Sequence, residues 1–108
     1  MKTAIKLLLV ILALAMMFST WSVAEDMMGA DLYKAKCAPC HGVDGKGQTP
    51  MGKKMGLKDL GSAEVQGKSD ADLNAIITNG KAPMPGYKGK LMDAQIASLV
   101  KYIRTLKK

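Results

Sequence analysis

Residues 25–108 hold too few large apolar side chains to fill an interior by themselves. The whole chain has one Trp, one Phe and three Tyr, and both Trp21 and Phe18 lie before residue 25. A domain this small buries a modest share of its surface and often needs a disulfide, a metal or another staple. The two cysteines stand three positions apart, so a disulfide between them would join no distant segments. They are therefore expected to serve chemistry rather than chain stability.

The first 24 residues have the layout of a secretory signal peptide. Lys2 and Lys6 precede an uncharged apolar stretch from Leu7 to Phe18, and the small residue Ala24 stands just before two acidic residues. We expect cleavage after Ala24, which leaves residues 25–108 as the mature domain. An uncleaved membrane anchor is the alternative, because the uncharged run up to Ala24 is about the minimum length that spans a bilayer.

The expected mature domain is basic. The formal charge of the chain is +7 at pH 7, and loss of Lys2 and Lys6 with the signal lowers it to +5. A lysine-rich surface keeps a protein soluble and speeds encounters with acidic partner proteins. Nucleic acid is not an expected partner, because the lysines are scattered and export separates them from it.

The apolar spacing predicts an all-α domain of three or four helices. The first is expected over about Met27 to Cys40, and the glycine-rich segment from Gly42 to Gly56 is expected to form neither helix nor strand. A weak helical turn is placed around Leu57 to Val65. Two longer helices are expected between a cap at Ser69 and a stop at Gly80, and from about Asp93 to Leu106.

The segment Cys37-Ala38-Pro39-Cys40-His41 has the pattern that attaches haem c. Cysteines at positions i and i+3 of a helical turn project to one side, so both sulfurs can reach the vinyl groups on one porphyrin edge. His41 is the only histidine in the chain, and its neutral imidazole suits the fifth ligand position of the iron. The sequence therefore predicts one covalent haem through Cys37 and Cys40, with His41 on the metal.

A chance match, a zinc site and a thioredoxin-like dithiol fit this segment less well. Ordinary Cys and His frequencies give about one chance match per thousand chains of this size. A zinc site needs a second ligand pair, and the chain has no further Cys or His. A thioredoxin-like dithiol expects a βαβ setting, which the helical pattern contradicts.

The sixth ligand is expected to be a methionine. Residues 25–108 contain Met27, Met28, Met51, Met55, Met84 and Met92. We favour Met84, because Pro83 and Pro85 stiffen the backbone around it and reduce the entropy lost when its thioether is held at the iron. Met51 and Met55 stay open as ligands, while the methionines at helix starts are expected only to pack.

These segments resemble the small class I c-type cytochromes of bacteria over essentially all of residues 25–108. The similar segments are Cys37 to Gly42 for haem attachment, Asn79 to Pro85 for the methionine loop, and Leu91 to Ile96 with Leu99 to Arg104 for the terminal helix. The resemblance also implies that the first and last helices cross, with Gly29 and Tyr33 against Leu99 and Tyr102. One departure is Met92, which stands where many members have a Ser or Thr helix cap.

The resemblance implies the cytochrome c fold, with the helices wrapped around the haem. It also implies that the Pro50 carbonyl accepts a hydrogen bond from the second ring nitrogen of His41, although Pro50 could equally be an ordinary turn proline. His41 and Met84 on the iron would suit a soluble, periplasmic one-electron carrier that cycles Fe(II) and Fe(III) and is not an enzyme.

Such a carrier is expected to be a monomer that meets acidic redox partners transiently and reaches membranes only through their complexes. Its exposed haem edge would be ringed by Lys34, Lys46, Lys81, Lys88 or Lys90. Two alternatives stay open: a haem-based peroxidase or gas-binding protein with a displaceable sixth ligand, and a redox subunit docked in a membrane complex.

Overall fold

The computed structural model describes residues 28–108, and the expected signal peptide lies outside these residues. The first helix runs without a break from residue 28 to His41, which confirms the prediction over its described part. Its middle, η1 (Tyr33–Cys37), has wide π-helical turns, and α2 (Ala38–His41) follows. Pro39 lacks a backbone donor for the regular α-helical bond, and the wide turn precedes it.

The glycine-rich segment contains a helix that the sequence analysis did not expect. This helix is α3 (Pro50–Met55), and the Thr49 side chain caps it by accepting from the Gly52 amide at 2.9 Å. Proline suits the first helical position, where its missing N–H is not needed. Gly56 ends the helix in the left-handed region at φ 66°. The glycines thus lie mostly in the flanking turns, and the expectation of no helix was wrong.

The remaining helices follow the predictions more closely. The short α4 (Ala63–Gln66) overlaps the weak turn expected up to Val65, and α5 (Asp70–Asn79) is capped by the Ser69 hydroxyl as expected. The last helix, α6 (Asp93–Arg104), stops two residues before the expected Leu106. Its start has no Ser or Thr cap, but the Gln95 side chain accepts from the Met92 amide at 2.8 Å.

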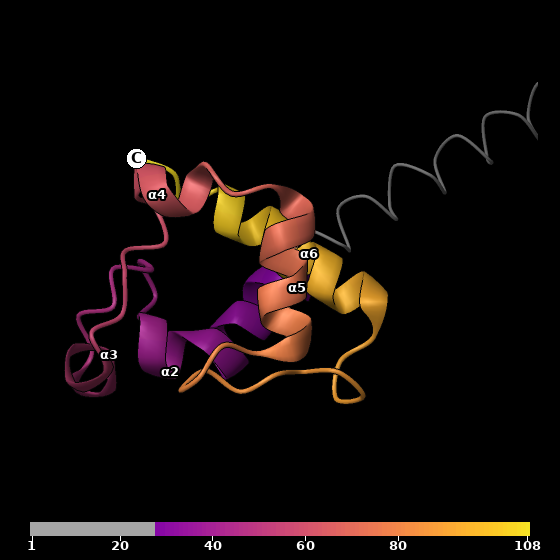
Figure 1. Cartoon of the computed structure of the whole chain (residues 1–108), viewed down its shortest axis with the longest axis horizontal. Helices are drawn as coiled ribbons and strands as arrows, with labels where there is room; N and C mark the ends of the chain where they lie inside the picture. The colour runs from indigo at the N-terminus through magenta and orange to yellow at the C-terminus, as the bar shows by residue number, and fades with distance from the viewer. Residues whose placement is uncertain (1–27) are drawn as a thin grey trace, which may run out of the picture.

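The helices lie at different depths in the view of Figure 1. The α5 helix lies in front of α6 and the first helix, while α4 lies beside the C-terminus. Arg104 links α6 to the end of α4 and the start of α5, because its guanidinium donates to Asp70 and to the carbonyls of Gln66 and Lys68. Within residues 28–108 there are isolated β-bridges but no strand, so the class is all-α. No helix in this part is long and apolar enough to cross a membrane.

The core is centred where the first helix crosses α6 and extends to Val65, Leu73 and Ile77 of α4 and α5. Tyr33 and Leu99 are fully buried, and the ring of Tyr33 lies 4.9 Å from that of Tyr102 between centroids, at a 42° tilt. A side chain on Gly29 would place its Cβ 2.5 Å from the Ser98 carbonyl oxygen, so glycine is what permits this close approach. The crossing implied by the family resemblance is confirmed.

Replacing Gly29 with Ala should therefore lower the free energy of unfolding. The added methyl group forces the two helices apart, which we expect to cost about 1–3 kcal/mol, despite the better helix propensity of Ala. Denaturant unfolding of the haem-loaded protein, followed by circular dichroism, measures this loss. Ala97→Ser, at an exposed position of α6, should change stability by less than about 0.5 kcal/mol. A more stable Gly29→Ala protein would contradict the close crossing.

Candidate functional site

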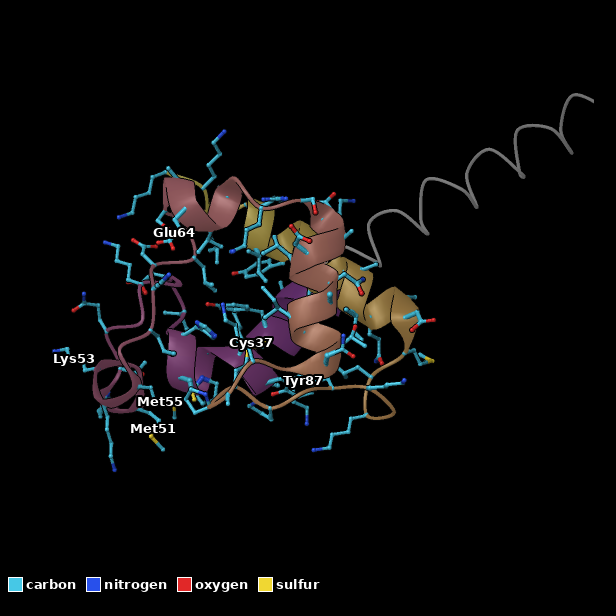
Figure 2. All side chains as sticks on the ribbon, viewed as in Figure 1. Cys37, Met51, Lys53, Met55, Glu64 and Tyr87 are labelled. Carbon is cyan, nitrogen blue, oxygen red and sulfur yellow. The ribbon has the colours of Figure 1, made fainter. Side chains whose placement is uncertain are left out.

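The two cysteines lie on one wall of an apolar hollow. Cys37 ends η1, Cys40 lies in α2, and both are free thiols of intermediate exposure. Burial, with a smaller contribution from Cys40, raises the pKa of the Cys37 thiol to about 11, so this thiol is protonated at neutral pH. Figure 2 shows Cys37 toward the centre of the molecule, whereas Met51 and Lys53 project outward from α3.

The hollow has two parts that share some of their lining residues. Cys37, His41 and Met84 line both parts. We call one part outer and the other inner. The outer part is completed mainly by Met55, Leu57, Pro83, Pro85 and Tyr87, and the inner part by Leu60, Val65, Leu73, Ile76, Ile77 and Ile103. A nearly apolar lining with a few polar groups in place suits an apolar cofactor.

His41 is a half-buried side chain with one buried ring nitrogen that has no partner in the described part of the chain. Burial lowers the pKa of its imidazole, which favours the neutral form that metals bind. Its Nδ1 atom is buried and has no hydrogen-bond partner among the described residues. An unpartnered buried nitrogen costs about 1–3 kcal/mol, and Nδ1 lacks a partner that the described residues could supply.

The hydrogen bond from His41 to the Pro50 carbonyl, implied by the family resemblance, is not formed. Pro50 is the first residue of α3, and carbonyls in a helix point along its axis toward the C-terminus. Thr49 makes the contact between these segments instead, because its hydroxyl donates to the carbonyl of Cys40.

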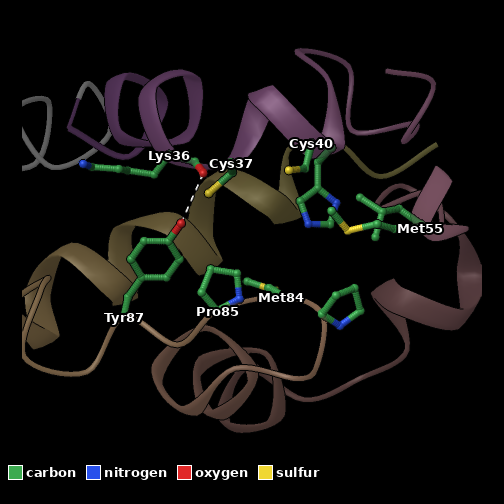
Figure 3. Close-up of a pocket in the computed structure, with 10 residues that line it drawn as sticks. Lys36, Cys37, Cys40, Met55, Met84, Pro85 and Tyr87 are labelled. Atoms are coloured by element: carbon green, nitrogen blue, oxygen red, sulfur yellow. Dashed lines mark hydrogen bonds between the residues drawn. The ribbon is translucent and has the colours of Figure 1, made fainter. Parts of the chain in front are cut away.

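Met84 lies across the hollow from the cysteines. A pair of backbone hydrogen bonds with Lys81, at 2.8 and 3.1 Å, holds the turn that carries it. Figure 3 shows Met84 beside Pro85 and across the hollow from Cys40. Met84 is half-buried and packs against the core, so its side chain is held rather than solvated.

The other two candidate methionines are placed differently. Met55 lines the outer part of the hollow, while Met51 is 47% exposed and lines neither part. Met84 is the only one of the three that lines both parts together with His41.

Comparison with known proteins agrees with this geometry. The family model for cytochrome c oxidase, cbb3-type, subunit III matches residues 24–103. Cytochrome c6 of Nostoc sp. is 36% identical over 100 residues, which cover 88% of this chain and 86% of that protein. The chain belongs to the class I c-type cytochromes.

Two further relatives place this cytochrome among both small and large proteins. The cbb3-type cytochrome c oxidase subunit CcoP of Azospirillum brasilense is 36% identical over 80 residues, which are 72% of this chain but 27% of that protein. The structure of the KustC0563 c-type cytochrome matches with a TM-score of 0.69 at 35% identity, over 74% of this chain and 98% of that one.

Family membership makes this cytochrome an electron-transfer protein with covalently bound haem c rather than an enzyme. The residues present fit that group. The hollow is apolar, two free thiols lie together on one wall, and a neutral imidazole with an unpartnered nitrogen lies beside them.

The sequence analysis missed several residues of the site. It gave Tyr87 no role, although Tyr87 lines the outer part of the hollow. It also missed Lys36 at the same part and the inner wall contributed by Leu60 and Val65. The position of Tyr87, three residues after Met84 in a loop with few other large side chains, was the available signal for an aromatic near the ligand.

Proposed function

We propose that this cytochrome is an exported, freely diffusing one-electron carrier whose haem is attached through Cys37 and Cys40 and held at the iron by His41 and Met84. The observation that carries the proposal is the position of His41 and Met84, which line both parts of the same hollow from two different segments. An imidazole and a thioether on the metal leave no free position for a substrate, which favours electron transfer over ligand chemistry.

The haem supplies a single electron by alternating between ferrous and ferric iron, and a methionine ligand favours the ferrous form. The residues of this chain bind, orient and shield that group. Met84 is stiffened by the flanking Pro83 and Pro85, and the inner part of the hollow presents the apolar side chains of Leu60, Leu73 and Ile103. Because the same two side chains are held in place throughout, little structural change need accompany the gain or loss of the electron.

A second candidate function is a redox domain that stays docked in a membrane complex. The match to the cbb3-type subunit III family and the similarity to CcoP favour it. The basic surface instead favours a freely diffusing carrier with transient encounters. The similarity to cytochrome c6 over most of both chains also supports the diffusing carrier over the docked domain.

The assignment of the sixth ligand predicts a spectroscopic difference between methionine variants. Met84→Ala should remove the charge-transfer band that methionine gives with ferric iron at the red end of the visible spectrum. It should also lower the reduction potential, because a ligand that favours ferrous iron is lost. Absorption spectra and potentiometric titration of the purified haem proteins measure both effects.

Met55→Ala and Met51→Ala are the matched controls, and both should retain the band. A band that survives in Met84→Ala and disappears in Met55→Ala would move the ligand to α3. A high-spin spectrum in the unsubstituted protein would instead favour a gas-binding or peroxidase function with an open iron position.

The docking surface is proposed around the mouth of the outer hollow. Lys36 lines it, and the lysines proposed to ring the haem edge are all exposed: Lys34, Lys46, Lys81, Lys88 and Lys90. Positive charge there would attract acidic partners over about one Debye length, roughly 8–10 Å at physiological salt.

Reversing this charge should slow oxidation of the reduced protein by the anion ferricyanide. Lys36→Glu and Lys81→Glu should each lower the second-order rate at low salt, and the difference should shrink in high salt because charge is screened. Stopped-flow absorbance measures the rates. Lys101→Glu makes the same change on α6, beside a groove lined by Asp70 and Asn74, and should slow the reaction less. Equal slowing by all three variants would contradict a local patch.

Export and free diffusion predict a defined mature protein. The N-terminal sequence of the exported form should begin at Glu25, and gel filtration should show a monomer in the soluble fraction. A chain that keeps Met1 and fractionates with membranes would support the anchored or docked alternative.

A further inference from the structure

The loop that carries Met84 is closed at its base and fixed to the end of α5. A Cβ on Gly80 would lie 2.6 Å from the amide nitrogen of Gly86, and one on Gly86 would lie 2.6 Å from the carbonyl carbon of Asn79. The Tyr87 amide donates to the Ile77 carbonyl at 2.9 Å. The methionine loop and the end of α5 are therefore joined into one wall of the hollow.

One side chain joins this wall to the opposite one. The hydroxyl of Tyr87 donates to the carbonyl of Lys36 at 3.3 Å, and Lys36 directly precedes Cys37 (Figure 3). Among residues 28–108, this is the hydrogen bond that links the methionine loop to the cysteine-bearing helix. Burial raises the pKa of the Tyr87 hydroxyl, so it keeps its proton and remains a donor at neutral pH.

We propose that Tyr87 is a positioning residue that holds the two walls together and so opposes displacement of Met84 from the iron. The inference rests on the proposed ligation by Met84. An incoming ligand can replace the thioether only if the wall that carries Met84 moves away from the cysteine wall. The backbone of Tyr87 is bound to α5, and its hydroxyl is bound to Lys36. That movement must therefore break the hydrogen bond between the Tyr87 hydroxyl and the Lys36 carbonyl.

The aromatic ring and the hydroxyl can be separated experimentally. Tyr87→Phe keeps the ring that lines the hollow and removes only the donor to Lys36. Tyr33→Phe makes the same chemical change at a fully buried site, where the hydroxyl donates to the Gly42 carbonyl at 2.7 Å. That bond joins two segments on the His41 side of the hollow and does not involve the methionine loop.

The test is a titration of the ferric haem protein with imidazole, followed by loss of the methionine–iron band. Tyr87→Phe should lower the imidazole dissociation constant about fivefold, equivalent to about 1 kcal/mol, because opening the hollow no longer breaks this bond. Tyr33→Phe should change it less than about twofold, yet should lower the denaturant midpoint more than Tyr87→Phe does. The contrast separates ligand control from general stability.

Each result bears on the proposal. An unchanged dissociation constant for Tyr87→Phe, with the band present in the unsubstituted protein, would overturn the role of Tyr87 alone. Equal shifts in both tyrosine variants would also overturn it, because a general loss of stability would then explain them. Absence of the band from the unsubstituted protein would overturn Met84 ligation and the role of Tyr87 together.

Discussion

An apolar hollow between two walls governs the arrangement of this small cytochrome. The buried core is centred on the helix crossing around Tyr33, Ile96 and Leu99 and extends to residues of α4 and α5. Four of these core side chains, Val65, Leu73, Ile77 and Ile103, also line the hollow. A haem bound there would add to this apolar core, and its attachment at two cysteines would supply the staple that a domain of this size needs. Cofactor binding and folding are thus served by the same residues.

The longer helices could be predicted because their signals are local. The Ser69 hydroxyl caps α5 by accepting from the nearby Asp72 amide, and α6 has a regular apolar stripe. The helix α3 was missed because its signals, Thr49 and Pro50, are few and are surrounded by glycines that indicate a loop. There the capping residue and the first-turn proline favoured a helix more strongly than the surrounding glycines disfavoured it.

The sequence could predict which residues the structure brings together at the hollow where residue chemistry alone singles them out. Cys37, Cys40 and His41 form a recognisable pattern, and Met84 is set apart by its two prolines. Contacts between distant segments could not be predicted in the same way. The partner of the Tyr87 hydroxyl lies 51 positions away in the sequence, and the implied contact between His41 and Pro50 fails on the direction of one carbonyl in a helix.

The close approach at Gly29 also constrains when the protein can assume its shape. It joins a residue near the start of the described chain to Ser98 in the last helix, so the crossing cannot form until nearly the whole polypeptide has emerged. Contacts between such distant positions form late, because a long loop must first close. Until then the cysteine segment is open to solvent, and the Cys37 thiol escapes the burial that suppresses its ionisation in the finished domain. The topology therefore leaves an interval, between synthesis and closure, in which the attachment residues are chemically most accessible.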